Sequence, residues 1–396
     1  MRTFIYENKS HDLCYGCRAC EQVCPKQAIS MIPDQEGFIY PVIDQTKCID
    51  CDLCKKVCPT QDANKEHLLH SEQTKVYAAW NNDLQLRLKS TSGGIFYTLA
   101  LQFIHDGGVV YGATMNNDFT VTHCRVSLIS DLVKLRGSKY VQSNTLNTFK
   151  QVKEDLIKGY KVLYSGTPCQ IAGLRGFLRK EYKNLYTVDL VCHGTPSPHI
   201  FKCHIKYLEN THKKRLNTFL FRDKKESGWR AYVSYVFSNR QKQYRTTQND
   251  FYCYCFYNGW LSRKSCYICE YSQARRVGDI TLSDFWGGEQ VYKQLKIQRK
   301  YGYNLVICNT AQGQQLFDKI SHDITYITCE MAAAKTGDVR LRHSEEKPSL
   351  RDKIYIECRG HGYEYIVNKY KYHPSFIRRM TPLWVINLVK EVKSRL

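Results

Sequence analysis

The sequence has 396 residues, which is long enough for more than one domain with a sizeable core. Its composition is that of a folded protein and excludes a low-complexity chain: 43% of the residues are hydrophobic and 24% are charged. The formal net charge is +21, but residues 1–74 carry only 8 Lys and Arg against 11 Asp and Glu, so the positive charge lies in the body. The charge is spread out and no nucleic-acid-binding motif accompanies it, which excludes nucleic acid as the expected partner.

The start of the chain and its cysteines predict a cytoplasmic protein. Residues 1–12 are polar and contain no apolar run of the kind found in a secretory signal. The longest apolar stretch, about 95–104, is far shorter than the ~20 residues that span a bilayer. Of the 19 cysteines, eight fall in two tight runs before residue 60, which is typical of metal ligation in a reducing compartment.

The two runs have the spacing of bacterial ferredoxins. The first is Cys14-Tyr-Gly-Cys17-Arg-Ala-Cys20-Glu-Gln-Val-Cys24-Pro25, and the second is Cys48-Ile-Asp-Cys51-Asp-Leu-Cys54-Lys-Lys-Val-Cys58-Pro59. In that pattern the fourth cysteine of each run binds the other cluster. We therefore expect one 4Fe–4S cluster on Cys14, Cys17, Cys20 and Cys58, and a second on Cys48, Cys51, Cys54 and Cys24. Zinc is the alternative metal, but the doubled four-cysteine pattern followed by proline disfavours it.

After a polar segment at 61–74, interpreted as a linker, strands and helices alternate as far as residue 210. The hydrophobic patterns predict strands at about 75–80, 107–113, 120–126, 161–164 and 185–191, and helices at about 95–105, 130–135 and 144–158. This alternation indicates an α/β layer with parallel strand pairs. Strand-like residues at 216–248 then predict a mixed sheet.

Two buried strands run directly into cysteine-containing loops. Residues 161–164 lead into Ser165-Gly-Thr-Pro168-Cys169-Gln170, and residues 185–191 lead into Cys192-His193-Gly-Thr-Pro196. Pro168 suits the first turn of a helix, which places Cys169 at a helix N-terminus where a thiolate is stabilised. The carboxyl ends of parallel strands share one sheet edge, so we expect Cys169 and Cys192 to converge.

A further pair, Cys266 and Cys269, could complete a third 4Fe–4S site with Cys169 and Cys192. The alternatives are buried cysteines that act as small hydrophobic residues, a Cys266–Cys269 redox disulfide, zinc, or a catalytic thiolate at Cys169. His193 could move a proton near neutral pH or serve only as a structural histidine. The other seven cysteines show no pattern, and we expect most of them in the core.

Two loops could bind an anion. Ser92-Gly93-Gly94 precedes a predicted helix and could hold a phosphate at its N-terminus, although such turns are common. The loop at 136–143, which contains Lys139, Tyr140, Gln142 and Ser143, could contact an anion or be an ordinary solvated loop.

In combination, these motifs resemble the β-subunit family of the deazaflavin (coenzyme F420) hydrogenases and dehydrogenases. The motifs are Ser92-Gly-Gly94, Ser165-Gly-Thr-Pro-Cys-Gln170, Asp189-Leu-Val-Cys-His-Gly194, Phe221-Arg-Asp-Lys224, Ser265-Cys-Tyr-Ile-Cys269 and Asp279-Ile-Thr-Leu-Ser-Asp-Phe-Trp-Gly287. The resemblance implies an FAD protein and favours the third cluster. It places FAD near Ser92, Gly93 and Gly94 and near Lys139, Tyr140, Gln142 and Ser143. Because family members differ in substrate, it does not identify the electron acceptor.

The expected fold is a mixed α+β and α/β arrangement: a ferredoxin-like domain at 1–62, a larger mixed-sheet, flavin-binding domain at 75–345, and a basic extension at 346–396. The expected function is an iron–sulfur flavoprotein oxidoreductase that passes electrons between clusters and FAD to a small molecule or a redox partner protein. The rivals are an electron-transfer subunit without a substrate and a redox-sensing regulator. Residues 378–396 predict a basic amphipathic helix that either packs on protein or lies weakly on an anionic membrane.

Overall fold

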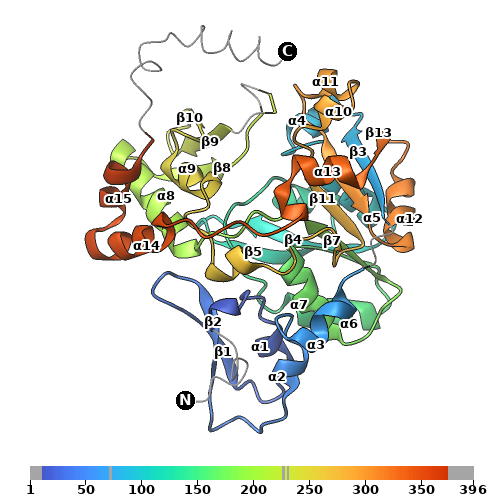
Figure 1. The fold of residues 1–396 in the computed structure, drawn as a ribbon, viewed down its shortest axis with the longest axis horizontal. Coiled ribbons are helices and arrows are strands. Elements are labelled where there is room, and N and C mark those ends of the chain that lie inside the picture. Colours follow the sequence, from blue (N-terminus) through green and yellow to red (C-terminus); the bar gives the residue numbers. More distant parts are fainter. Residues whose placement is uncertain (1–10, 71–73, 225–227, 230–231, 373–396) are drawn as a thin grey trace.

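The computed structural model describes residues 11–70, 74–224, 228–229 and 232–372. Its N-terminal unit is small and contains an antiparallel hairpin of β1 (Ile29–Pro33) and β2 (Ile39–Ile43). Two short helices accompany the hairpin, α1 (Ala19–Val23) and α2 (Leu53–Lys56), and they pack against each other. In Figure 1 this unit lies at the bottom, below the rest of the protein.

The two short helices begin in the same unusual way. Arg18 directly precedes α1 with a φ of 64°, and Asp52 directly precedes α2 with a φ of 57°, so both lie in the left-handed region. Each of these residues follows the second cysteine of its run. The repeated cysteine spacing therefore corresponds to a repeated backbone conformation, as expected of two equivalent halves.

The polar segment that was expected to be a linker contains a helix, so that prediction was wrong. The helix is α3 (Asp62–Leu68), and it packs against α7 (Pro168–Leu178) of the body. The Arg175 guanidinium on α7 donates a hydrogen bond to the Leu68 carbonyl over 2.7 Å. Polar residues can form a helix in this position because the fold supplies partners for its end.

An eight-stranded mixed sheet forms the centre of the body, with the strand order β13-β3-β12-β11-β7-β6-β4-β5. Its strands are β3 (Lys75–Asn81), β4 (Val109–Met115), β5 (Val121–Val126), β6 (Val162–Ser165), β7 (Leu185–Leu190), β11 (Ile280–Asp284), β12 (Asn304–Cys308) and β13 (Ile324–Cys329). Strands β4, β6, β7 and β11 are parallel, and the remaining pairs are antiparallel. The predicted α/β layer with parallel pairs is therefore confirmed.

The large sheet is mixed as predicted, but the strands that were expected to make it mixed form another sheet. The strands at 216–248 do not join it; β8 (Leu216–Leu220), β9 (Tyr232–Phe237) and β10 (Lys242–Thr246) form a separate antiparallel sheet in the order β10-β9-β8. The antiparallel strands of the large sheet come instead from β3, β5, β12 and β13. Periodicity locates a strand but does not say which sheet it joins.

Helices cover both faces of the large sheet (Figure 1). One apolar layer joins α5 (Ile95–His105) and α12 (Ala311–Lys319) to the sheet. The opposite layer joins α6 (Thr148–Ile157) and α7, and it also includes Tyr15, Cys17 and Val57 of the N-terminal unit. The other helices of four or more residues are α4 (Leu84–Leu88), α8 (Pro198–His212), α9 (Phe251–Tyr257), α10 (Gly288–Val291), α11 (Leu295–Gln298), α13 (Met331–Gly337), α14 (Leu350–His361) and α15 (Tyr363–Tyr370), with 3-10 segments at Ile129–Leu135 and Lys264–Ile268.

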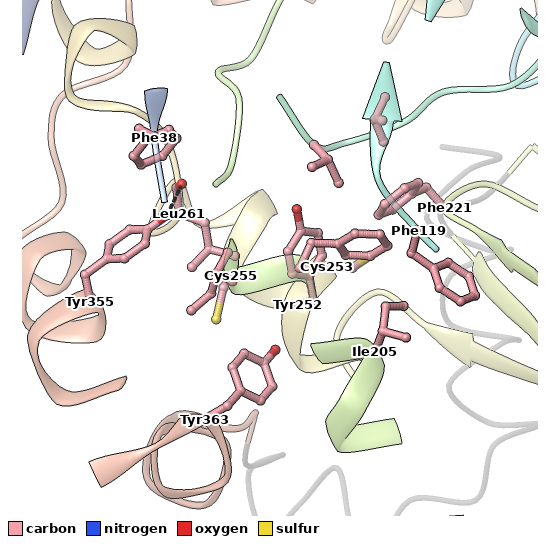
Figure 2. Close-up of a cluster of buried hydrophobic side chains, with 14 of the residues drawn as sticks. Phe38, Phe119, Ile205, Phe221, Tyr252, Cys253, Cys255, Leu261, Tyr355 and Tyr363 are labelled. Atoms are coloured by element: carbon pink, nitrogen blue, oxygen red, sulfur yellow. Dashed lines mark hydrogen bonds between the residues drawn. The ribbon is translucent and has the colours of Figure 1, made fainter. Parts of the chain in front are cut away.

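An aromatic cluster joins segments that are far apart in the sequence (Figure 2). It contains Phe38 from the turn between β1 and β2, Tyr252 from α9, Tyr355 from α14 and Tyr363 from α15. The Tyr355 hydroxyl donates a hydrogen bond to the Leu261 carbonyl over 2.7 Å. The described part of the C-terminal extension is therefore packed into the core. The predicted amphipathic helix at 378–396 lies outside the described residues.

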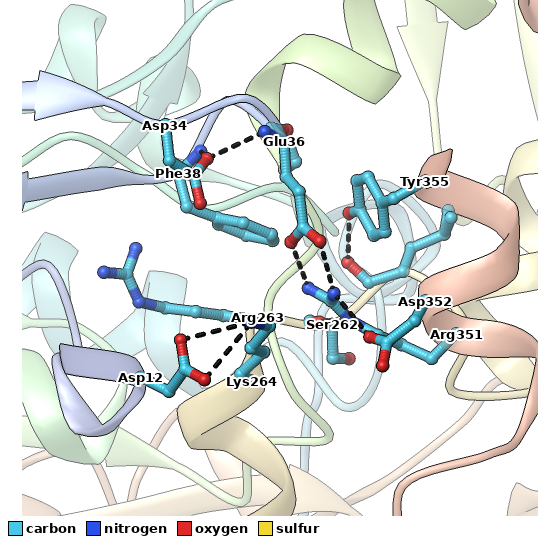
Figure 3. Close-up of polar contacts among 12 residues, drawn as sticks. Asp12, Asp34, Glu36, Phe38, Ser262, Arg263, Lys264, Arg351, Asp352 and Tyr355 are labelled. Atoms are coloured by element: carbon cyan, nitrogen blue, oxygen red, sulfur yellow. Dashed lines mark hydrogen bonds and ion pairs between the residues drawn. The ribbon is translucent and has the colours of Figure 1, made fainter. Parts of the chain in front are cut away.

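The extension also binds the N-terminal hairpin through a buried ion pair, which Figure 3 shows together with its neighbours. The Arg351 side chain on α14 is fully buried and donates two hydrogen bonds to the Glu36 carboxylate, in addition to one from its Nε to the Ser262 carbonyl. On the other side of the same turn, the Ser197 hydroxyl at the start of α8 donates to the Glu36 carbonyl. The hairpin turn is thus held between α8 and α14.

In the part of the chain that the structure describes, no helix is both long enough and apolar enough to cross a membrane.

Candidate functional site

The first group of four cysteines comes together as the spacing predicts. Burial raises the pKa of the Cys17 thiol, and its proximity to Cys58 raises it further. Burial also raises the pKa of Cys20, with added contributions from Cys17, Cys14 and Cys58. The backbone N–H of Gly16 donates to Cys14 Sγ over 3.3 Å. These four side chains form one buried group, and as thiolates they would repel one another.

The second group lines a pocket of its own. Cys24 from the first run lies there with Cys48, Cys51 and Cys54 from the second run. The Ala28 N–H donates to Cys24 Sγ over 3.3 Å, and Cys51 is exposed. The crossover of the fourth cysteine fits the ferredoxin arrangement, and this group lies closer to solvent than the first.

Four cysteines from three separate segments line another cavity, in the body. They are Cys169 on α7, Cys192 after β7, Cys266 in the 3-10 segment Lys264–Ile268, and Cys269 directly after it. Because β6 and β7 are parallel neighbours, the loops that follow them meet at one sheet edge. The expected convergence of Cys169 and Cys192 is present.

The surroundings of these four thiols disfavour their ionisation. Burial raises the pKa of Cys192 to about 12 and that of Cys269 to about 11, and the neighbouring Cys266 adds to each shift. The Cys169 thiol lies at the N-terminus of α7, but burial raises its pKa too, so the predicted stabilisation of a free thiolate there is outweighed. Four thiols that line one cavity fit the donor set of a 4Fe–4S cluster.

Polar groups surround these thiols. The Thr167 hydroxyl, which caps α7 together with Gln170, lies 3.2 Å from Cys169 Sγ. Arg276 lines the cavity and forms a buried ion pair with Asp189 at 3.2 Å. Its positive charge lowers the pKa of both Cys192 and Cys269 in part. The cavity therefore supplies hydrogen-bond donors and a fixed cation beside a group that would carry negative charge.

Two tyrosines lie between this cavity and the first ferredoxin group. The rings of Tyr15 and Tyr271 are 5.7 Å apart, and the Tyr271 hydroxyl donates to the Pro59 carbonyl over 2.8 Å. Burial raises the pKa of Tyr271, and both Cys169 of the cavity and Cys17 of the ferredoxin group raise it further. Tyr271 is therefore close to both groups of thiols, and the two groups are neighbours.

Helix α7 fixes this neighbouring arrangement. Cys169 lies in its first turn, and Gly173 lies one turn later, where an added Cβ would come within 2.8 Å of Cys17 Sγ. At Gly176, after a further turn, an added Cβ would lie 2.5 Å from the Val57 carbonyl oxygen. The glycines allow α7 to lie directly against the ferredoxin unit.

We predict that Gly176→Ala destabilises the contact between α7 and the ferredoxin unit by roughly 1–3 kcal/mol, because a backbone carbonyl cannot move aside as a side chain can. The matched control is Gly360→Ala in α14, where an added Cβ meets nothing within 4 Å and the helix should gain about 0.5–1 kcal/mol. Thermal unfolding of the anaerobic protein measures both. Equal melting temperatures for the two variants would contradict the close contact.

His193 lies at the edge of the cavity, with its side chain 45% exposed. Its Nε2 is 3.1 Å from Oδ2 of the buried Asp338. Burial raises the pKa of Asp338, but the hydrogen bond and charge of His193, together with Arg340, outweigh it, so the pKa of the carboxyl lies below its usual range. His193 is therefore positioned by a carboxylate and remains open to solvent, which suits either a proton-transfer or a structural role.

The two segments predicted to hold FAD meet, since the Ser138 N–H donates to Thr91 Oγ1 over 2.9 Å, but their residues make different contacts. The Ser92 hydroxyl donates to the Tyr303 carbonyl over 2.7 Å, and a Cβ at Gly93 would lie 2.4 Å from the Ala79 carbonyl oxygen. Gly94 precedes α5 with a φ of 91°. This turn packs tightly against the sheet, so close packing explains its glycines, and its phosphate-binding role stays a prediction.

The second predicted FAD segment is divided between two places. Gln142 lines the cysteine cavity and donates to the Tyr15 carbonyl, whereas Ser143 accepts from Gln170, another residue of the lining. Burial lowers the pKa of Lys139 to about 7, and its ammonium donates to two backbone carbonyls. Tyr140 points elsewhere and stacks on Phe256, with ring centroids 4.4 Å apart.

Tyr140 instead belongs to a group that sequence reasoning quoted but did not assign. The Tyr140 hydroxyl accepts from Arg222, which pairs with Asp284 over 2.8 Å and lies 5.4 Å from the Trp286 ring centroid. Trp286 stacks on Trp229 and is 39% exposed. Within the described residues, Arg222 Nη2 is buried without a hydrogen-bond partner. The sequence signal for this group was the pair of motifs at 221–224 and 279–287. Their contact is seen only in the folded structure.

Among the described residues, no three His, Cys, Asp or Glu side chains form a group compact enough for a single metal ion. Most of the remaining cysteines lie in the core as expected; Cys253, Cys255, Cys308 and Cys329 are buried. Cys124, Cys203 and Cys358 are exceptions, since each is half-buried, and Cys203 and Cys358 lie side by side.

Two family models match parts of the chain. Residues 159–334 match the family described as the C terminus of the coenzyme F420 hydrogenase/dehydrogenase beta subunit, and residues 13–61 match the 4Fe–4S dicluster domain. No curated protein matches the chain. Among solved structures, one titled "Xenon derivatization of the F420-reducing [NiFe] hydrogenase complex from Methanosarcina barkeri" is similar, with a TM-score of 0.45 and 15% identity, covering 76% of this chain and 94% of that one.

The matched regions contain all twelve cysteines of the three groups. The resemblance to the coenzyme F420 hydrogenase/dehydrogenase β-subunit family, with a 4Fe–4S dicluster domain at the N-terminus, is confirmed.

Proposed function

We propose that this protein is an iron–sulfur oxidoreductase that relays electrons through three 4Fe–4S clusters. The ligands would be Cys24, Cys48, Cys51 and Cys54 for the outer cluster, Cys14, Cys17, Cys20 and Cys58 for the inner one, and Cys169, Cys192, Cys266 and Cys269 for the third. When bound, each cluster accepts and donates single electrons. The observation that carries the proposal is the cavity that four cysteines from three segments share, next to the inner ferredoxin group.

The chain's own residues hold the inner ferredoxin group and the third group of thiols close together. Gly173 and Gly176 let α7 approach the ferredoxin unit, and Tyr15 and Tyr271 fill the space between the two groups of thiols. The exposed Cys51 places the outer group where a redox partner protein could approach. The cysteine chemistry is that of a reducing compartment, and we infer the cytoplasm.

Anaerobic preparation tests the proposal. The brown holoprotein should contain about twelve irons and take up about three electrons in a reductive titration. An iron content of about eight and an uptake of about two electrons would mean that only the two clusters of the ferredoxin domain are present. Zinc in place of iron after anaerobic reconstitution would overturn the proposal.

We further propose that the chain binds FAD, on the strength of the family resemblance. The site that we propose is the surface around Arg222, Tyr140 and Trp286, because Tyr140 of the predicted segment lies there. There the exposed Trp286 ring offers stacking area, and the buried Arg222 guanidinium has an unused N–H. An aromatic ligand with anionic or carbonyl oxygens would satisfy both.

We predict that Trp286→Ala lowers the flavin retained after purification, because it removes the stacking surface, which is worth about 0.5–1.5 kcal/mol beyond buried area. Tyr326→Ala on β13 is a control, since Tyr326 is comparably exposed at 42%. Absorbance of the supernatant after denaturation measures the flavin. Wild-type protein that binds none after incubation with FAD would leave the rival function, an electron-transfer subunit that docks a partner enzyme and has no substrate. Turnover by the isolated chain with an artificial reductant separates these functions.

A further inference from the structure

Two cysteines outside the three groups lie together on neighbouring helices. Cys203 is on α8 and Cys358 is on α14, both are half-buried, and their thiols are in hydrogen-bonding contact. Both pack on the outside of the same aromatic cluster. His199 lies one helical turn before Cys203, with its Nε2 3.7 Å from Cys203 Sγ.

The surroundings make the two thiols chemically unequal. The hydrogen bond from the Cys358 thiol lowers the pKa of Cys203, and the positive charges of His199 and Lys206 lower it further, against the effect of burial. The same hydrogen bond and burial raise the pKa of Cys358. Cys203 is thus the better nucleophile at neutral pH, and Cys358 is the adjacent thiol that can resolve a mixed disulfide.

The pair lies beside the turn that holds the ferredoxin hairpin. Ser197 at the start of α8 donates to the Glu36 carbonyl, and Arg351 on α14 donates to the Glu36 carboxylate. At the next residue of the turn, Gly37, a Cβ would lie 2.3 Å from His199 Cβ. A covalent link between α8 and α14 would therefore close around this turn.

We propose that Cys203 and Cys358 form a reversible disulfide that fastens α14 to α8 around the Glu36 turn. The oxidant is a low-molecular-weight disulfide. The Cys203 thiolate attacks it, one sulfur–sulfur bond breaks as another forms, and one small thiol leaves. The Cys358 thiol then loses its proton, attacks Cys203 Sγ and releases the second small thiol. Two protein thiols are oxidised, and one small disulfide is reduced to two thiols.

The sequence allows a clean assay of this reaction. Trypsin releases Cys203 in the peptide 203–206 and Cys358 in the peptide 354–359, each with a single cysteine. Anaerobic holoprotein is incubated with oxidised glutathione, blocked with N-ethylmaleimide, digested without reductant and mapped by mass spectrometry. Both free peptides should be lost, a linked pair should replace them, and dithiothreitol should restore them. The iron content should stay constant, which shows that the cluster ligands are untouched.

Two variants test the order of attack. Cys358→Ser should retain glutathione on Cys203, because no thiol resolves the mixed disulfide, whereas Cys203→Ser should leave Cys358 largely unmodified. Cys124→Ser, another half-buried cysteine, should behave as wild type. Glutathione on both cysteines without a linked pair in wild-type protein, or equal reaction at Cys124, would overturn the proposal.

Hydrogen exchange tests the fastening. Exchange in α14 and in the Glu36 turn should slow in the oxidised wild type but not in Cys203→Ser treated in the same way. A linked protein with unchanged exchange there would contradict the fastening of the turn.

Discussion

Replacing Cys169 by Ser should remove about four of about twelve irons and leave the two ferredoxin clusters intact. A serine hydroxyl is a poor ligand for iron at neutral pH, and the other three thiols line the same buried cavity. Iron analysis together with electron paramagnetic resonance of the reduced protein measures the loss. Cys266→Ser should give the same result, because it removes a ligand from a different segment of the same group.

The control for this experiment is Cys124→Ser, which changes a half-buried cysteine that belongs to none of the three groups. Its iron content should equal that of the wild type. If Cys169→Ser keeps all its iron and loses only turnover, Cys169 is a nucleophile and not a ligand. If both Cys169→Ser and Cys266→Ser keep the wild-type count, there is no third cluster.

The parts of the site that depend on local sequence could be predicted. Eight ferredoxin cysteines are identified by spacing alone, because successive ligands within each run lie on a single short loop. Cys169 and Cys192 could also be placed together, since each follows a buried strand and parallel strands end at one edge.

Contacts that depend on the assembled fold were harder to predict from the sequence. The strand β11, which follows the Cys266–Cys269 segment, pairs with β7, with Ile280 opposite Val188, and no local pattern specifies that pairing. The Ser92–Gly94 turn shows that a local pattern can have two explanations. A glycine before a helix can make room for a phosphate or for a neighbouring strand, and Gly93 makes room for a strand. Arg222 and Asp284 form a pair although they are 62 positions apart in the sequence, beyond any periodicity.

The C-terminal extension gives the clearest example of a contact that depends on the assembled fold. The sequence predicted only that this extension is basic, and the structure shows the Arg351 side chain completely buried against Glu36. A basic residue can enter a core when a carboxylate and backbone carbonyls satisfy its donors, and only the fold provides those partners.

We expect Arg351→Met to be the most destabilising of the single substitutions considered. Removing one partner of a buried ion pair costs about 3–5 kcal/mol, because the other charge is left uncompensated. Glu36 is 17% exposed and would regain some hydration, so the lower end of that range applies. The melting temperature of the anaerobic holoprotein should fall by several degrees, and a protease should cut the released β1–β2 hairpin sooner.

The control is the ion pair between Lys347 and Asp352, which lies near the start of the same helix with side chains 42% and 46% exposed. Asp352 also accepts a hydrogen bond from Arg351 over 3.0 Å, so only Lys347 is replaced. An exposed pair contributes about 0–1 kcal/mol, so Lys347→Ala should leave the melting temperature almost unchanged. The double variant Glu36→Gln with Arg351→Met should lose less than the sum of the two single variants, because the residues are coupled. Additive losses, or equal melting temperatures for Arg351→Met and Lys347→Ala, would show that α14 does not hold the hairpin through this pair.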